Sequence, residues 1–374
     1  MTLGTKNTVA IIDIGSNAVR LVIYDGFSRA PVRVYSERVI CNLGPDLATS
    51  GSLNVESKEQ AKASLRRFAG LIAAMNITNV RAVATAALRD AKDGKEFVAA
   101  VQAEMGLDIA IIDGEEEARL SAQAVRAGGV DGVAVIGDYG GGSLELIVMD
   151  KGVVMHKASL PIGSHRLQNE DDSDEQVKII ETHLCSVSFL DDFKGQSFYA
   201  MGGAWRSMAQ AHIYMSQHPF RLIDSYQVSG KEATAFASML ARQKPAELER
   251  TIGMSRKRIR DMSVAALTME LLFKKIQPKR LVFAGTGLRD GLIFDQLDTA
   301  TQKQDGLLAS CRTIAVNTSR GGNAALLQEL FQWLRPLFAE RDAAVLRLVE
   351  ASCLLSDLCW FEHEDYQAEH AFQR

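Results

Sequence analysis

Two segments of this chain repeat one pattern of strand, tight turn and strand. Residues 9–26 read VAIIDIGSNAVRLVIYDG, and residues 133–152 read VAVIGDYGGGSLELIVMDKG. In each copy an apolar run reaches an Asp, a Gly- and Ser-rich turn follows, and a second strand-like run comes after it. Such a turn offers backbone N–H groups to an anion, and the carboxylate beside it suits the divalent cation that accompanies phosphate. The repeat therefore predicts duplicated lobes that hold phosphate between them.

The composition is that of a large folded protein. The chain has 374 residues, 47% of them hydrophobic, which is enough for more than one domain with its own core. A formal net charge of −4 argues against a general nucleic-acid-binding protein, so a polyanionic substrate must meet a local basic patch. We expect no membrane span and no signal peptide. The five cysteines form no CxxC pair, which favours a reducing, cytoplasmic setting.

Strand and helix patterns alternate along most of the chain. Beyond the two hairpins, strands are expected at residues 31–35, 80–84, 109–112, 197–200 and 280–284. Helices are expected at residues 56–75, 95–105, 115–127, 231–243 and 262–275, with a short one capped by Thr85. This alternation predicts a layered α/β fold whose strand ends carry the chemistry. The expected division is a first lobe at 1–125, a second lobe at 126–306 and an all-helical segment at 307–374.

Glycine-rich motifs at the predicted strand ends carry a resemblance to known proteins. Asp13-Ile14-Gly15-Ser16-Asn17 and Asp138-Tyr139-Gly140-Gly141-Gly142-Ser143 look like the two phosphate motifs of the actin-like and sugar-kinase superfamily. Gly202-Gly203 and Ala284-Gly285 stand where that superfamily has its later glycine motifs. More narrowly, the chain resembles the exopolyphosphatase/guanosine pentaphosphate phosphohydrolase (Ppx/GppA) family from about residue 9 to about residue 300. The distinguishing runs are TAALR at 85–89, GEEEARL at 114–120, GGGSLEL at 140–146 and GLRDG at 287–291.

The resemblance implies both a fold and a reaction. The fold would be two duplicated actin-like, ribonuclease H-like lobes with a cleft between them, followed by the start of an incomplete HD-like helical domain. Longer family members resemble His-Asp phosphohydrolases in that last region. Here Ser356-Asp357 replaces the His-Asp step, so no second active site is expected. The implied reaction is the magnesium-dependent removal of the terminal phosphate from inorganic polyphosphate.

Glu117 is the candidate catalytic residue. Hydrolysis of a phosphoanhydride needs a water, a base that orients or deprotonates it, and cations for the phosphate oxygens. The resemblance assigns the base to Glu117, by its position before Ala118-Arg119. From the residues alone another role stays open. Three Glu residues after Asp113-Gly114 also suit a helix N-terminus, where negative charge is stabilised by the helix dipole.

The other candidate residues are carboxylates for a metal and ligands for phosphate. Mg²⁺ takes a few carboxylates together with waters and phosphate oxygens. The carboxylates expected to hold it, directly or through water, are Asp138, Glu145 and Asp13. The expected phosphate ligands offer backbone N–H, hydroxyl, amide or guanidinium donors. They are Gly15, Ser16, Asn17, Arg20, Arg89, Gly141, Gly142, Ser143 and Arg258. The alternatives are turn formation for the Asp residues, pairing with a carboxylate for Arg20 and an outward-facing strand position for Glu145.

The sequence leaves other functions open. The nearest alternative is release of the 5′ phosphate from guanosine pentaphosphate, which also ends in a phosphoanhydride. A more remote one is an ATP-dependent kinase or an actin-like ATPase. Trp205, beside Gly202-Gly203, could stack on a guanine or fill the core of its lobe, and the core is favoured. The expected partners are polyphosphate or guanosine pentaphosphate and a second copy of the chain, with no nucleic acid and no membrane.

Overall fold

The structure, a computed structural model, describes residues 8–45, 47–130, 132–168, 173–252, 254–320 and 324–373. The chain forms two compact units, Met1–Phe27 with Val32–Gln296 and Ser28–Pro31 with Leu297–Arg374. Both sheets belong to the first unit, and the second unit is helical. The helical unit thus begins at Leu297 and not at the predicted residue 307. It also includes residues 28–31, because Arg29 Nε donates to the Gln304 carbonyl at 3.1 Å.

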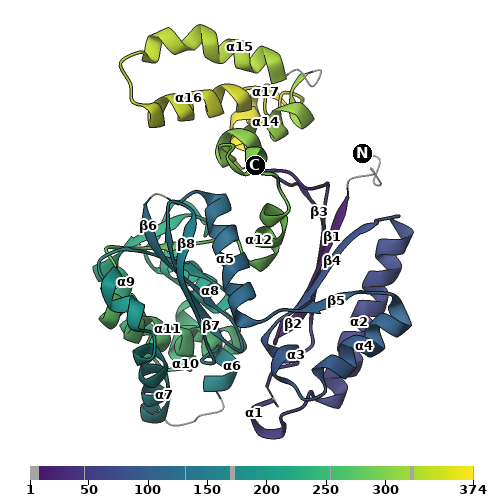
Figure 1. Ribbon diagram of the computed structural model, residues 1–374. Helices are drawn as coiled ribbons and strands as arrows, with labels where there is room; N and C mark the ends of the chain where they lie inside the picture. The colour runs from purple at the N-terminus through teal and green to yellow at the C-terminus, as the bar shows by residue number, and fades with distance from the viewer. Residues whose placement is uncertain are drawn as a thin grey trace. The chain divides into compact units, whose positions relative to one another are not determined.

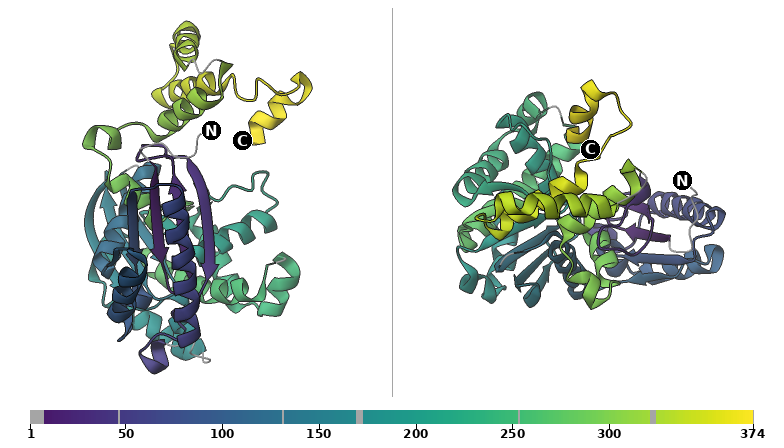
Figure 2. Two further views of the ribbon diagram at one scale, coloured as in Figure 1. Left: turned by 90° about the vertical axis from the view of Figure 1, so that its right-hand side faces the viewer. Right: turned by 90° about the horizontal axis from the view of Figure 1, so that it is seen from above.

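The first lobe is built on a five-stranded sheet. Its strands are β1 (Val9–Ile14), β2 (Ala18–Tyr24), β3 (Arg33–Ile40), β4 (Asn79–Ala84) and β5 (Ile109–Ile111). They lie in the order β3-β2-β1-β4-β5, with an antiparallel β1-β2-β3 meander that β4 and β5 extend in parallel. Its helices are α1 (Leu47–Ser50), α2 (Val55–Ala74), α3 (Ala86–Asp90) and α4 (Gly94–Met105). α2 and α4 pack side by side over this sheet and bury Leu65, Phe68 and Val101 there (Figures 1 and 2).

The second lobe repeats that topology. Its strands are β6 (Val133–Tyr139), β7 (Leu144–Asp150), β8 (Val153–Leu160), β9 (Ser197–Met201), β10 (Tyr226–Ser229) and β11 (Arg280–Phe283). The run β8-β7-β6-β9-β11 matches β3-β2-β1-β4-β5 in order and in direction, and β10 is added antiparallel at the edge. The two hairpins of the sequence are β1-β2 and β6-β7. The predicted duplication of actin-like α/β lobes is confirmed.

A thick helical layer covers one face of the second sheet. Its elements are α6 (Ser164–Leu167), α7 (Ser173–Cys185), the 3-10 helix η1 (Ser188–Phe193), α8 (Gly203–Met215), α9 (Gly230–Arg242), α10 (Pro245–Ile252) and α11 (Arg256–Ile276). α11 packs against α7, α8 and α9. Trp205 is fully buried in this layer, stacks on Tyr139 and donates from Nε1 to the Ala265 carbonyl at 3.0 Å. The interpretation of Trp205 as a core residue is confirmed.

Two helices lie between the sheets of the first unit, α5 (Gly114–Gly128) and α12 (Leu288–Asp295). α5 buries Ala118 and Val125 against the second sheet, and its Leu120 packs with Val83 and Ile112 of the first lobe. α12 packs on α5 and sends Ile293 into a cluster with β1 and β2 (Figure 1). The predicted boundary at residue 125 therefore falls inside a helix that contacts both sheets.

The helical unit contains α13 (Thr299–Gln302), α14 (Gly306–Thr318), α15 (Ala324–Leu334), the 3-10 helix η3 (Arg335–Phe338), α16 (Ala343–Leu355) and α17 (Glu364–Gln373). α14, α15 and α16 pack together around a small core that includes Cys311, Leu327 and Leu354. Throughout the described ranges, no helix combines the length and the apolar character needed to cross a membrane.

Most predicted elements are present, with differences at their ends. β3 extends to Ile40, beyond the predicted residue 35, because it pairs with β2 along its length. α11 begins at Arg256, so the basic run expected to precede this helix forms its first turns. β8 had no counterpart among the predicted strands. Most of its residues are exposed, so it lacks the clean apolar alternation of a half-buried strand.

The close approach of α12 to α5 gives a first prediction. A Cβ on Gly291 of α12 would lie 1.9 Å from the Leu120 carbonyl oxygen, which is backbone and cannot rotate away. Gly291→Ala should therefore lower the free energy of unfolding by about 1–3 kcal/mol, measured by urea denaturation. Gly70→Ala in α2 is the matched control, because a Cβ there meets nothing within 4 Å. It should be neutral or stabilising by up to about 1 kcal/mol. Equal stability of the two variants would contradict this description of the helix contact.

Candidate functional site

The glycine-rich turns of the two hairpins line one cleft, which has a volume of about 660 Å³. The turns close in the same way. Gly15 N donates to the Ala18 carbonyl at 3.0 Å, and Gly140 N donates to the Ser143 carbonyl at 2.9 Å. Every turn residue predicted to bind phosphate lies on the cleft wall: Gly15, Ser16, Asn17, Gly141, Gly142 and Ser143. The predicted residues Asp13, Arg20, Glu117 and Arg258 line the same cleft.

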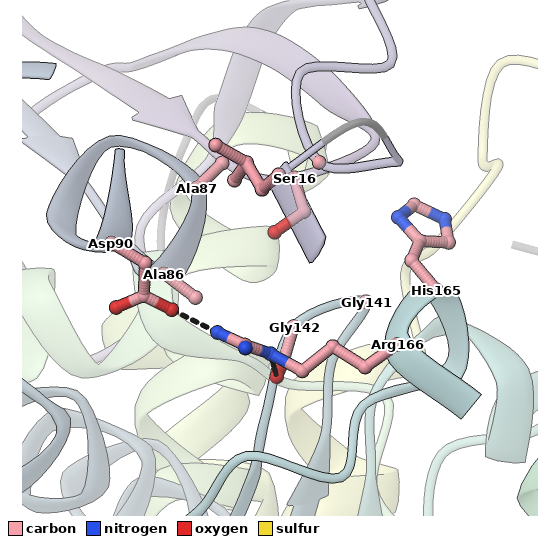
Figure 3. A pocket seen from close by; sticks show the side chains of 10 residues that line it. Ser16, Ala86, Ala87, Asp90, Gly141, Gly142, His165 and Arg166 are labelled. Atoms are coloured by element: carbon pink, nitrogen blue, oxygen red, sulfur yellow. Dashed lines mark hydrogen bonds and ion pairs between the residues drawn. The ribbon is translucent and has the colours of Figure 1, made fainter. Parts of the chain in front are cut away.

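The turns of the two lobes touch one another. A Cβ on Gly142 would lie 2.7 Å from the Ala86 Cβ and 3.2 Å from the Ser16 hydroxyl, so only glycine fits there. Beyond this contact lies a small cavity of about 20 Å³, lined in part by Ser16, Ala86, Gly141 and Gly142 (Figure 3). A volume of this size holds about one water.

An ion pair between the lobes borders that small cavity. Arg166 of α6 donates from Nε to the Gly142 carbonyl at 2.8 Å, and its terminal nitrogen pairs with Asp90 of α3 (Figure 3). Asp90 also lies 3.5 Å from Nε of Arg89. A chain of charged contacts therefore links the second lobe to Arg89 of the first.

Glu117 stands in the first turn of α5, whose N-cap Asp113 accepts a hydrogen bond from the Glu116 N–H. Arg89 donates to the Glu117 carboxylate at 3.0 Å and to the Ile112 carbonyl at 3.2 Å. The pKa of Glu117 is raised to about 7. Burial is the main cause, the charges of Asp138 and Asp13 add to the increase, and Arg89 opposes it. A carboxylate with a pKa near neutrality can take a proton from water at physiological pH.

Asp138 and Glu145 face one another across the β6-β7 pair, as Asp13 and Arg20 do across β1-β2. Glu145 is fully buried and Asp138 is partly buried, and burial raises the pKa of each. Asp138 accepts a hydrogen bond from the Ser121 hydroxyl at 2.6 Å, and Glu145 accepts one from the Ser159 hydroxyl at 2.9 Å. The charges of Glu117 and Asp138 raise the pKa of Glu145 further. Duplication has thus put a cation in one lobe where the other has a carboxylate.

Two predicted residues have partners that the sequence did not indicate. Arg89, expected to bind phosphate, donates to Glu117, and like Asp138 and Glu145 it is not among the residues that line the cleft. Asp13, expected on the metal side, pairs with Arg289 of α12 at 2.8 Å. Among the residues that the structure describes, no group of three His, Cys, Asp or Glu side chains is placed to ligate one metal ion directly.

Three cleft arginines were not among the predicted ligands: Arg38, Arg206 and Arg289. Arg289 belongs to the GLRDG run, which carried the family resemblance, so the sequence could have indicated it as a cleft residue. Arg206 follows the Gly202-Gly203 pair by one turn of helix. Arg38 gave no signal, because the strand that carries it was expected to end at residue 35.

A sequence model of the Ppx/GppA phosphatase family matches residues 22–300, which is most of the chain. The chain belongs to this family. It is therefore a phosphoanhydride hydrolase, and the family predicted from its motifs is confirmed. The Ppx/GppA match includes the second phosphate turn but not the first, because it begins within β2, after the first turn.

Individual Ppx/GppA relatives are distant but cover most of the chain. Exopolyphosphatase 1 of Mycobacterium tuberculosis is 26% identical over 342 residues, which are 84% of this chain and 98% of the relative. The solved Aquifex aeolicus family member has 24% identity and a TM-score of 0.66, over 80% of this chain and 99% of that one. A Cytophaga hutchinsonii exopolyphosphatase structure has 22% identity and a TM-score of 0.69, over 78% and 99%. At these identities the two structures show the shared fold.

The raised pKa of Glu117 gives a second prediction. A carboxyl group whose pKa is higher in the folded than in the unfolded state lowers stability as pH rises from its unfolded pKa to its folded pKa. For Glu117 this interval runs from about 4.5 to about 7. Glu117→Gln removes the effect. The free energy of unfolding of the variant minus that of the unmodified protein should therefore be larger at pH 8 than at pH 5. The increase between the two pH values should be roughly 1–3 kcal/mol.

The measurement is urea unfolding at both pH values with a chelator present. Glu115→Gln is the control, because this residue lies in the same helical turn but its side chain is 76% exposed. An equal trend in the two variants would show that the effect does not come from burial of Glu117.

Proposed function

We propose that this protein is an exopolyphosphatase, which hydrolyses the terminal phosphate of inorganic polyphosphate with a water activated by Glu117. The observation that carries the proposal is the placement of Glu117. Its carboxylate lines the cleft that both phosphate-type turns line, and its pKa is raised to about 7. The printed names of the M. tuberculosis and C. hutchinsonii relatives support the same substrate class.

In this proposal the chain supplies the base, the phosphate contacts and the positioning. The turns 15–17 and 141–143 would bind the terminal phosphate through N–H groups and hydroxyls. Glu117 would accept a proton from the attacking water. Arg89 holds the Glu117 carboxylate in one orientation at 3.0 Å and favours its charged form, which a base must recover after each turnover.

We propose Mg²⁺ as the cofactor. The charges of Glu117 and Asp138 raise the pKa of Glu145, and the charge of Asp138 raises that of Glu117, so a divalent cation would offset this repulsion. Asp138 and Glu145 would hold the ion. Mg²⁺ keeps several waters and takes phosphate oxygens, so it does not need three direct carboxylate ligands. Asp13 is the weaker candidate for a metal ligand, because its carboxylate already pairs with Arg289. When bound, the ion would neutralise charge on the transferring phosphoryl group.

Guanosine pentaphosphate is the alternative substrate. Trp205 cannot stack on a guanine, because it is fully buried. A phosphate-release panel with long polyphosphate, tripolyphosphate, guanosine pentaphosphate and ATP, each with and without magnesium, compares the alternatives directly. Faster turnover of the guanine nucleotide than of any polyphosphate would replace the proposed substrate. A homodimer and a cytoplasmic location stay predictions from the sequence.

A third prediction concerns turnover. Glu117→Gln keeps the shape of the side chain but cannot accept a proton, so kcat on polyphosphate should fall about 10²–10⁴-fold. Binding of tripolyphosphate, measured by calorimetry, should stay within about threefold, because the phosphate contacts remain. Glu116→Gln is the control, since this neighbour pairs with Arg119 away from the cleft. A kcat within threefold of the unmodified enzyme would exclude Glu117 as the base.

A fourth prediction concerns the metal. Asp138→Asn should raise the magnesium concentration needed for half-maximal activity by about tenfold or more, because a neutral amide is a poorer ligand for a hard cation. The titration is done at saturating polyphosphate. Asp13→Asn should raise it less, since Asp13 already pairs with Arg289. An unchanged midpoint for Asp138→Asn would place the ion elsewhere.

A further inference from the structure

Four arginines from both lobes form a cluster on the cleft wall: Arg20 of β2, Arg38 of β3, Arg206 of α8 and Arg289 of α12. The pKa of Arg20 is lowered to about 10. Burial is the main cause, and the charges of the other three arginines contribute to the decrease. The guanidinium groups are therefore close enough to repel one another. Within the described ranges, Arg289 is the member of this cluster that has an ion pair, with Asp13. The cluster has an excess of positive charge for an anion to offset.

Arg206 is a partly buried member of this cluster, and its guanidinium is not fully hydrogen-bonded. Its Nε is buried and has no hydrogen-bond partner in the described structure. Three carboxylates act on it through space, and each is already engaged by another donor. Asp138 accepts from Ser121 at 2.6 Å, Asp290 from the Gly287 N–H at 2.8 Å and Asp224 from the Gly285 N–H at 2.7 Å. A buried guanidinium nitrogen without a hydrogen-bond partner is costly, unless a ligand supplies the missing acceptor.

The first turn of α8 points to the same kind of ligand. Gly203, Ala204, Arg206 and Ser207 all line the cleft, and the N-cap Gly202 has no side chain to accept a hydrogen bond from the first-turn N–H groups. Unsatisfied N–H groups at a helix N-terminus carry partial positive charge and bind anions. The helix end and Arg206 thus offer donors to one point of the cleft.

We propose that Arg206 and the first turn of α8 form a second phosphate subsite, which holds phosphate groups on the leaving side of the scissile bond. The proposal rests on the proposed function, in that the terminal phosphate occupies the turns 15–17 and 141–143. The ligand chemistry is a second phosphate group joined to the first: either the following units of a linear polyphosphate or the separate diphosphate of guanosine pentaphosphate. Arg20 and Arg38 supply further charge beside it.

Arg206 could instead serve only to balance the charge of Asp138. In that case its removal would reduce the turnover of every substrate alike, because Arg206 would act only at the scissile phosphate, which all the substrates share. A leaving-side subsite predicts a different result. The loss should grow with the number of phosphates that follow the scissile bond, and should appear mainly in KM.

The test compares Arg206→Ala and Arg206→Lys with Arg260→Ala, which removes an exposed arginine that does not line the cleft. Substrates are pyrophosphate, tripolyphosphate and long-chain polyphosphate, and also GTP and guanosine pentaphosphate, which differ by the 3′ diphosphate. We expect Arg206→Ala to lower kcat/KM on long chains by roughly 10- to 100-fold, as for lost charge-assisted hydrogen bonds, and by less on pyrophosphate, which has one phosphate after the scissile bond. Arg206→Lys should recover part of the loss, and Arg260→Ala should lose little on any substrate.

A binding measurement separates this proposal from the proposed function. In the Glu117→Gln background, calorimetry with tripolyphosphate and with inorganic phosphate should show weaker tripolyphosphate binding after Arg206→Ala and unchanged phosphate binding. That result would support the subsite even if Glu117 proved not to be the base. A greater loss of kcat/KM on guanosine pentaphosphate than on GTP would also support the subsite. It would show that the phosphate bound there is the 3′ diphosphate of the nucleotide. Equal losses on all substrates, or no loss, in a variant with unchanged urea stability would overturn it.

Discussion

Burial of the Glu117 carboxylate beside Arg89 is the interaction on which the site depends. Without burial, a glutamate at the start of a helix is an ordinary surface acid, stabilised by the helix dipole and unable to take a proton at neutral pH. Burial shifts its pKa to about 7, and Arg89 keeps the shift from going further. The position between the two sheets produces this environment, because α5 packs on both of them. Glu117 and the contact between the lobes are therefore features of the same helix.

The two lobes share a topology but have diverged at one pair of positions. Directly opposite residues of an antiparallel pair project on the same side of the sheet, about 4.5–5.5 Å apart. The first lobe puts Arg20 opposite its Asp, and the second puts Glu145 opposite its Asp. At this position the first lobe therefore has a cation and the second lobe has a carboxylate. Phosphate and a divalent cation need such opposite surroundings, and a symmetric duplication would have supplied only one of them.

The sequence predicted the parts of the molecule that depend on local pattern. The duplicated hairpins and the long helix α2 follow from apolar periodicity and glycine turns, and the family resemblance added to the choice of the ten predicted site residues that line the cleft. Contacts made between distant segments could not be read in this way. The partnership of Arg89 with Glu117, and of Arg289 with Asp13, joins elements far apart in the chain. β8 and the far end of β3 were missed because edge strands with exposed residues lack the period-two signal.

The contact between the two turns also decides how a phosphate chain can reach Glu117. Gly142 meets Ala86 and Ser16 so closely that no side chain fits between them, and the cavity beyond has room for about one water. The Arg166–Asp90 pair borders that cavity, so a phosphate group cannot pass between the lobes at this point. The large cleft, by contrast, has a volume of about 660 Å³ and is lined by the arginine cluster. In the proposed function, a closed end beside the turns and a cationic wall along the rest of the cleft would fit a substrate that presents one end to Glu117 and extends its remaining phosphates past Arg206.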